Sequence, residues 1–231
     1  MKTTLQLAAF SIAFCLGITL SAQVSLGFRT GATWSNVQAS EGLDALAPDF
    51  KTISGFNVAA VAEIAFGNNF SLQPELAFTR KGFGIKEDFN IDLFELPLPV
   101  GFRNDTRVNY VELPLLAKYK FGDENAQFYL MAGPSAGYAT NGRLLTRAKL
   151  LLIDVKVLDT PINLDAVNYE RLEVGVVAGA GVNINLGGTK LFFDGRYSHS
   201  FTQVYDIPVI EDRVSNRGFS INAGLMFPLG R

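Results

Sequence analysis

Eight segments of this chain alternate between apolar and polar residues with a period of two, and one face of every segment is free of charge. They span residues 24–37, 53–66, 70–85, 107–121, 126–141, 168–186, 189–204 and 216–229. Successive side chains of a strand point to opposite faces, so this period predicts eight β-strands. The apolar faces hold 49 positions without one Asp, Glu, Lys or Arg, although the charged content of 18% predicts about nine. The sheet therefore has one face suited to apolar surroundings.

The connections between these segments alternate strictly between long and short. Residues 67–69, 122–125 and 187–188 are tight turns rich in Gly, Asn and Asp. Residues 38–52, 86–106, 142–167 and 205–215 form the long connections. A membrane barrel has this alternation, with short periplasmic turns, long external loops and both chain ends on the periplasmic side. We therefore expect a location in the outer membrane with both termini in the periplasm.

The volume of the barrel interior decides between a soluble barrel and a membrane barrel. The interior of an eight-stranded barrel holds only a tight filling or one small ligand, so 49 mostly apolar residues do not fit inside it. Lipid accounts for the uncharged face, because a charged side chain costs about 2–4 kcal/mol at the bilayer midplane. We predict an all-β fold, an eight-stranded antiparallel up-and-down transmembrane β-barrel. Aromatic residues near the strand ends suit its two interfacial girdles: Trp34, Phe66, Phe70, Phe121, Phe128, Tyr138, Phe201, Phe219 and Phe227.

The first 22 residues have the pattern of a secretory signal peptide. Lys2 gives a positive start, residues 7–20 are apolar, and Ser21-Ala22 forms a small-residue cleavage site. The apolar run is too short for a transmembrane helix. Cleavage leaves one barrel domain, residues 23–231, which contains no cysteine because Cys15 lies in the signal. This domain has 19 basic and 22 acidic residues and no basic block, so we expect no nucleic-acid partner.

Two adjacent predicted strands read Val108-Asn-Tyr-Val-Glu-Leu-Pro-Leu-Leu-Ala-Lys-Tyr-Lys-Phe121 and Gly133-Pro134-Ser135-Ala136-Gly137. They resemble strands of the PorT-like outer-membrane barrel family, which is abundant in Bacteroidota. Residues 175–181, 193–198 and 216–227 resemble the last three strands of that family, so the resemblance covers the whole mature chain. It implies an eight-stranded outer-membrane barrel. The founding member is connected with protein secretion, and most relatives have no assigned activity.

Two details of the chain bear on this resemblance. Pro74, Pro114 and Pro134 fall inside predicted strands, where proline removes a ladder hydrogen bond and would mark a bulge or a rim. The resemblance implies that Pro114 and Pro134 are family features. The second detail is a departure: Phe227 is followed by four more residues instead of ending the chain. The terminal aromatic signal read by the barrel-assembly machinery, an expected partner, is therefore weaker or shifted.

The inward face carries a balanced set of charges. Five basic residues (Arg29, Lys81, Lys118, Lys120 and Arg196) face five acidic ones (Glu63, Glu75, Glu112, Glu173 and Asp194). Buried charges must be paired and hydrogen-bonded, so equal numbers favour a salt-bridged filling of the lumen. The alternative is a selectivity ring or a proton-linked path through a narrow channel.

Catalytic motifs are weak in this sequence. His199, the only histidine, lies between Ser198 and Ser200, but neighbours in a strand point to opposite faces, so neither serine is placed for a Ser–His–acid site. We expect His199 at the membrane interface, no metal site and no cofactor. Gly179-Ala180-Gly181 lacks the third glycine of a dinucleotide site, and residues 187–190 lack the upstream glycine of a phosphate loop.

The long connections are the remaining candidates for function. Two of them contain apolar runs that suit contacts with a protein partner: Leu93, Phe94, Leu96 and Leu98 in one, and Leu151 and Ile153 in the other. These runs either cover one another or form a partner site, and residues 144–158 either extend the neighbouring strands or fold into a lid. We predict a non-enzymatic barrel with a structural or partner-binding role. A narrow channel and a membrane-embedded acyl hydrolase or transferase are the alternatives.

Overall fold

The computed structural model describes residues 23–38, 50–93, 96–123, 125–150, 153–167, 169–203 and 215–229. The strands are β1 (Gln23–Gln38), β2 (Phe50–Phe66), β3 (Phe70–Leu93), β4 (Leu96–Gly122), β5 (Ala126–Leu150), β6 (Ile153–Ile162), β7 (Leu172–Asn185), β8 (Lys190–Ser200) and β9 (Ser215–Leu229). Within these ranges there is no helix long and apolar enough to cross a membrane. The predicted signal peptide and most of the predicted loops 38–52 and 205–215 lie outside the described residues.

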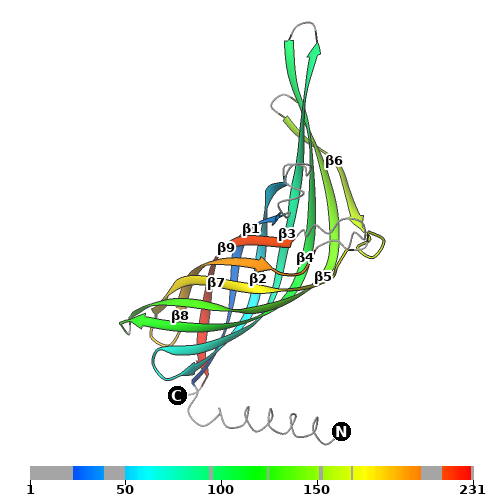
Figure 1. Ribbon diagram of the computed structural model, residues 1–231. Coiled ribbons are helices and arrows are strands. Elements are labelled where there is room, and N and C mark those ends of the chain that lie inside the picture. Colours follow the sequence, from blue (N-terminus) through cyan, green and yellow to red (C-terminus); the bar gives the residue numbers. More distant parts are fainter. Residues whose placement is uncertain are drawn as a thin grey trace, which may run out of the picture.

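Eight of the nine strands form a closed antiparallel ring (Figure 1). Its order is β1–β2–β3–β4–β5–β7–β8–β9, and β9 pairs with β1 from Val24↔Leu229 to Gln38↔Ser215. In the described part of the chain β6 pairs with β5 alone and lies outside the ring. The predicted eight-stranded antiparallel barrel is confirmed, with β6 as an addition. Closure pairs both edges of every strand in the wall, as a barrel in lipid requires.

The two ends of the barrel differ. At one, which we call the turn end, short turns join β2 to β3, β4 to β5 and β7 to β8, and the first and last strands begin and end there (Figure 1). Gly67, Gly122 and Gly187 have φ values of 73°, 115° and 64° in these turns, a region that glycine enters without steric cost. The opposite end, where the long connections begin, is the loop end.

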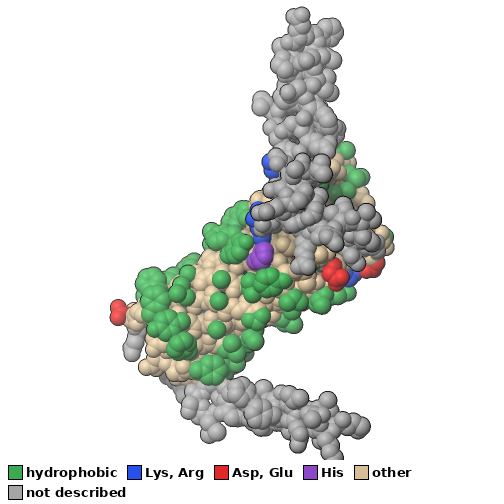
Figure 2. Space-filling model, viewed as in Figure 1, with side chains coloured by type: hydrophobic (Ala, Val, Ile, Leu, Met, Phe, Trp, Pro, Cys, Tyr) green, Lys and Arg blue, Asp and Glu red, His purple; other side chains and the backbone are tan. Residues whose placement is uncertain are grey.

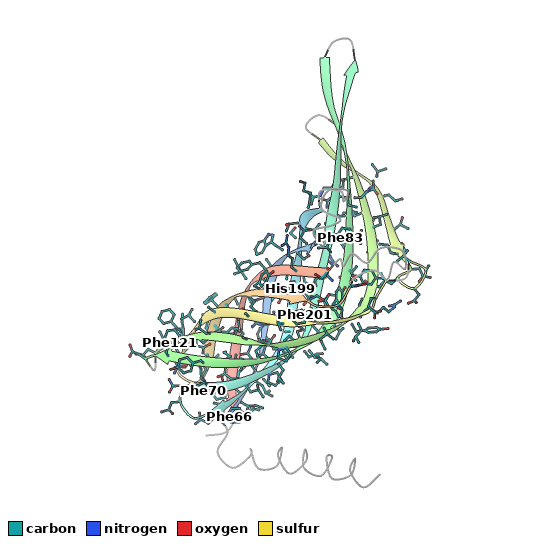
Figure 3. The ribbon with its side chains drawn as sticks, in the orientation of Figure 1. Phe66, Phe70, Phe83, Phe121, His199 and Phe201 are labelled. Atoms are coloured by element: carbon teal, nitrogen blue, oxygen red, sulfur yellow. The ribbon has the colours of Figure 1, made fainter. Side chains whose placement is uncertain are left out.

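The outer wall is apolar and the inner wall is polar, as the alternation predicts. Phe70, Leu113 and Phe128 are more than half exposed on the outside, whereas Glu63 and Lys118 are buried inside. On the visible face in Figure 2, charged side chains lie near the two ends, and hydrophobic ones are spread over the wall with backbone and other side chains between them. Phe66, Phe70 and Phe121 mark the turn end and Phe201 the opposite rim in Figure 3.

The height of this apolar belt matches a bilayer. In β2 the outward-facing positions run from Phe56 at the loop end to Phe66 at the turn end, and both rings are exposed. Ten residue steps of about 3.3 Å give about 33 Å along the strand. A strand tilt of about 40° reduces this length to about 25 Å, the usual height of the apolar band of a membrane barrel.

The three prolines do not mark bulges, so that expectation is wrong. Pro74, Pro114 and Pro134 lie within β3, β4 and β5, and the pairing registers are the same on both sides of them. A missing N–H interrupts the ladder without inserting a residue, so the strand stays in register. The register shifts lie nearer the loop end, between Thr52 and Asn57, Asn109 and Tyr110, and Thr146 and Arg147.

Two of the predicted loops are largely paired strand. β3 and β4 continue far beyond the wall and stay paired up to Leu93↔Leu96, and β5 and β6 pair up to Leu150↔Ile153 (Figure 1). We call residues 86–93 with 96–103, and 142–150 with 153–162, the external hairpins, because these strand pairs lie beyond the barrel wall. The prediction of loops over 86–106 and 142–167 is therefore wrong for most of their length, and strand extension is the correct alternative for the second. Above the rim no lipid imposes an apolar face, so these strands lack the alternation that marks the others.

Candidate functional site

The lumen at the turn end contains three ion-paired residues, Glu63, Lys118 and Lys120, which we call the turn-end cluster. The two carboxylate oxygens of Glu63 from β2 each lie 2.9 Å from a lysine Nζ of β4. Lys118 Nζ also donates to Gln73 Oε1 at 2.8 Å and lies 3.9 Å from the centre of the Tyr129 ring. Two ammonium groups share one carboxylate, so this cluster has a formal charge of +1.

The middle of the lumen contains the central cluster, formed by Arg29, Glu75, Asp194 and Arg196. Glu75 lies between the two guanidinium groups: Arg29 Nη2 is 2.8 Å from its Oε2, and Arg196 Nη1 is 2.9 Å from its Oε1. Arg196 also donates from Nε and Nη2 to both oxygens of Asp194, each at 2.8 Å. Arg29 Nη1 donates to the side-chain oxygens of Asn57 and Asn222. This cluster is neutral and fully hydrogen-bonded.

Nearer the loop end, Lys81, Glu112 and Glu173 form the loop-end cluster. Lys81 Nζ lies 2.5 Å from a carboxylate oxygen of each glutamate. Thr79 Oγ1 donates to Glu112 at 2.6 Å, and Asn216 Nδ2 donates to Glu173 at 2.6 Å. One ammonium between two carboxylates gives a formal charge of −1. The ten predicted lumen charges therefore form three ion-paired clusters with charges of +1, 0 and −1 along the barrel axis. Gln73 links the first two, because it accepts from Lys118 and donates to Glu75.

An apolar cap covers the lumen above the loop-end cluster. Tyr110 from β4 and Tyr169 from the β6–β7 connection have their hydroxyl oxygens 2.5 Å apart. Both rings are buried among Val37, Phe83, Val108, Ala139 and Leu164. Tyr110 and Tyr169 both have the inward phase of predicted strands, 107–121 and 168–186. Their contact depends on how these strands are placed around the barrel, so sequence reasoning missed the cap.

The space left inside the lumen is small. One cavity of about 50 Å³ lies between the central and loop-end clusters, lined by residues that include Arg29, Lys81 and Arg196. A second of about 40 Å³ lies beside Glu173 and Asn216. Each has room for a few water molecules. Cavities of this size are too small to form a continuous aqueous pore through the described residues.

His199 lies at the outer side of the loop-end rim. Its ring packs edge-on against Phe201 with the centroids 5.6 Å apart (Figure 3). The hydroxyl of Ser198 donates to the Gly218 carbonyl, and that of Ser200 lies 3.0 Å from the Thr202 hydroxyl. These contacts give the residues structural roles at the rim. Among the described residues no group of three or more His, Cys, Asp or Glu side chains is placed to hold a metal ion.

The sequence of this barrel matches one family along most of its length. Residues 17–206 match the model described as the outer membrane protein beta-barrel domain. The chain belongs to this family. An outer membrane barrel has its apolar belt in lipid, so the belt described above is the lipid-facing surface. No curated protein matches the sequence.

Several solved outer membrane barrels are similar in structure. Neisserial surface protein A is 14% identical, with a TM-score of 0.42 over 88% of this chain and 97% of that one. Ail of Yersinia pestis, in complex with the heparin analogue sucrose octasulfate, is 16% identical, with a TM-score of 0.42 over 89% and 99%. The N-terminal barrel domain of Pseudomonas aeruginosa OprF is 11% identical, with a TM-score of 0.38 over 90% and 100%.

The apolar loop residues singled out in the sequence fall in or beside the external hairpins. Leu93 ends β3, Leu96 and Leu98 begin β4, and Ile153 begins β6. Phe94 and Leu151 lie outside the described residues, as do the side chains of the other four. The structure therefore brings Leu93 and Leu96 together as a backbone pair at the end of the β3–β4 hairpin.

Sequence reasoning also missed a group of arginines at the base of the external hairpins. Arg80, Arg103, Arg107, Arg143 and Arg147 form what we call the arginine patch. Strand pairing places Arg107 opposite Arg143 and Arg103 opposite Arg147. Because β3, β4 and β5 are separated in the sequence, only their register reveals this proximity.

Proposed function

We propose that this outer membrane barrel is closed to solutes, has no catalytic activity, and acts by presenting its external hairpins to a protein partner. The observation that carries the proposal is the division of the molecule into a filled lumen and a projecting sheet. Paired charges and the Tyr110–Tyr169 cap occupy the lumen, whereas the hairpins extend the wall beyond the belt. In this proposal the hairpins are outside the cell and both termini are periplasmic, after signal-peptide removal and insertion by the barrel-assembly machinery. The PorT-like resemblance supports membership of that group.

The main alternative, a narrow channel, is tested by conductance. The purified barrel, refolded and inserted into planar bilayers, is expected to show no steady single-channel current. The three charge clusters block the lumen, and their ion pairs would have to separate before an ion could pass. A reproducible ohmic conductance from a homogeneous preparation would refute the closed barrel.

The orientation is tested with single cysteines, because the mature chain contains none. Asn90→Cys places a thiol on the β3–β4 hairpin, and Asn68→Cys is its matched variant in a turn at the opposite end. A membrane-impermeant maleimide is expected to label the first in intact cells and the second only after the outer membrane is opened. Labelling in the reverse order would contradict the proposed orientation.

Partner binding is tested by shortening one hairpin. Residues 88–101 are replaced by Asn-Gly, so that a two-residue turn joins the paired residues Glu87 and Phe102. The variant is expected to keep heat-modifiable gel migration, since the wall is untouched, and to lose a specific product of crosslinking in intact cells. If no crosslinked product depends on the hairpin, the partner-binding role is wrong.

A further inference from the structure

We propose that the arginine patch binds the phosphate groups of an anionic lipid headgroup in the leaflet at the loop end. This site is separate from the lumen and does not depend on the hairpins having a protein partner. Three properties of the patch carry the inference: its surplus of positive charge, its height relative to the apolar belt, and the shape of the pocket between its arginines.

The patch contains more cations than its own carboxylates neutralise. Asp105 is 1% exposed and forms ion pairs with three arginines. Its carboxylate oxygens lie 2.7 Å from Arg103, 3.4 Å from Arg147 and 3.8 Å from Arg107. Asp159 pairs with Arg143 at 2.8 Å. Five guanidinium groups and two carboxylates leave a formal charge of +3, and like charges this close repel one another unless an anion joins them.

Arg107 lies within this group of like charges. Burial lowers the pKa of its guanidinium, Asp105 opposes the shift, and the charges of Arg147, Arg80 and Arg103 add to it. Its Nε is buried without a hydrogen-bond partner among the described residues. An anion beside Arg107 would balance the neighbouring charges.

The patch begins where the apolar belt ends. Arg80 is the next outward residue after Phe78 in β3, and its guanidinium lies 5.0 Å from the centre of the Phe56 ring. At the strand tilt of about 40° used above, two residue steps along a strand correspond to about 5 Å along the membrane normal. Arg80 is then about 5 Å above the belt, and Arg107 and Arg143 about 10 Å. The polar layer of a leaflet covers about the same depth.

A pocket of about 160 Å³ opens between these side chains, lined by Arg80, Arg107, Asn109, Arg143, Leu145 and Asp159. Three of its six residues are arginines from three different strands. The planar guanidinium fork matches two phosphate oxygens at once, which makes arginine the usual ligand for this group. The surplus of three charges favours a headgroup with two phosphates over one with a single phosphate. Its position at the belt edge favours a membrane lipid over a soluble polyanion.

The test uses the folded mature barrel in detergent, titrated with bisphosphorylated lipid A, monophosphoryl lipid A or phosphatidylcholine and followed by native mass spectrometry. We expect binding in that order of affinity, with at least a tenfold difference between the two forms of lipid A. The variant R107Q/R143Q is expected to weaken binding of the bisphosphorylated lipid at least tenfold. R107K/R143K, which keeps the charge and loses the fork, is expected to give an intermediate loss.

The matched control removes two positive charges elsewhere. R171Q/K190Q changes one residue at the loop end outside the patch and one at the turn end, and is expected to bind within twofold of the parent. All variants are first shown to be folded by heat-modifiable migration. The proposal would be overturned if the three lipids bound with equal affinity, or if R107Q/R143Q bound the bisphosphorylated lipid as tightly as the parent does. It would also be overturned if the control variant lost as much affinity as R107Q/R143Q. So would preference for a soluble sulfated polysaccharide over lipid A, which would assign the patch to that class of ligand.

Discussion

The central cluster predicts a large loss of stability when Glu75 alone loses its charge. Its side chain is fully buried and accepts contacts of 2.8–3.0 Å from Arg29 and Arg196. Glu75→Gln keeps the shape but leaves two guanidinium groups with one carboxylate, Asp194. Removing one partner of a buried ion pair costs about 3–5 kcal/mol, because a buried charge is left uncompensated. We therefore expect E75Q to lower the free energy of unfolding by about 4 kcal/mol.

This loss is measured by urea unfolding of the refolded barrel in lipid vesicles, followed by gel migration and tryptophan fluorescence. If the free energy of unfolding falls by about 2 kcal/mol per molar urea, the urea concentration at the midpoint of unfolding is expected to fall by about 2 M. The double variant R29M/E75L removes one charge of each sign and leaves the Arg196–Asp194 pair, so it should be less destabilised than E75Q. Asp165→Asn, at an exposed ion pair, should leave the midpoint unchanged. A shift below about 0.5 M for E75Q would refute the argument that the lumen charges are mutually compensating.

Three further predictions concern the cap, the wall and an exposed pair. Tyr169→Ala should lower the free energy of unfolding by about 3 kcal/mol in the same urea assay, because it removes a buried ring and leaves a cavity. Gly133→Val should abolish the heat-modifiable band, because a β-carbon at this position would lie 1.9 Å from a main-chain oxygen of β4. Gly195→Ala should fold, because its β-carbon would meet only the edge of a ring at 3.4 Å. The hydrogen bond from Arg171 lowers the pKa of Asp165 below its usual 3.8, so their contact should be present above pH 3.8 and be lost on further acidification, as carboxyl NMR shifts would report.

The wall of the barrel was predictable because lipid acts on every outward position of it. Phe56, Leu113 and Phe128 belong to faces whose charge-free alternation is visible in the sequence, and they are exposed in the structure. The same alternation identifies the inward residues, so Glu75 and Arg196 could be assigned to the lumen before their pairing was known. Which acid meets which base was not predictable, because it depends on strand tilt and register across the barrel.

The hairpins and the arginine patch were not predictable for the opposite reason. Beyond Ile85 both faces of β3 and β4 are away from lipid, and Pro97 and Pro99 make the sequence read as a loop. Backbone pairing, which has no signature in composition, holds these strands together. Arg107 and Arg143 are 36 positions apart in the sequence and become neighbours only through the β4–β5 register.

The lumen clusters also bear on how this barrel folds. Each contains an ion pair between strands that are not neighbours in the ring: Glu63 of β2 meets lysines of β4, Glu75 of β3 meets Arg29 of β1 and Arg196 of β8, and Lys81 of β3 meets Glu173 of β7. A partly assembled sheet would carry these charges unpaired toward the hydrocarbon, where each is costly. Intermediates with half a wall are therefore high in energy. Insertion and closure should occur as one cooperative event, with the last strand pairing, β1 to β9, completing the neutralisation.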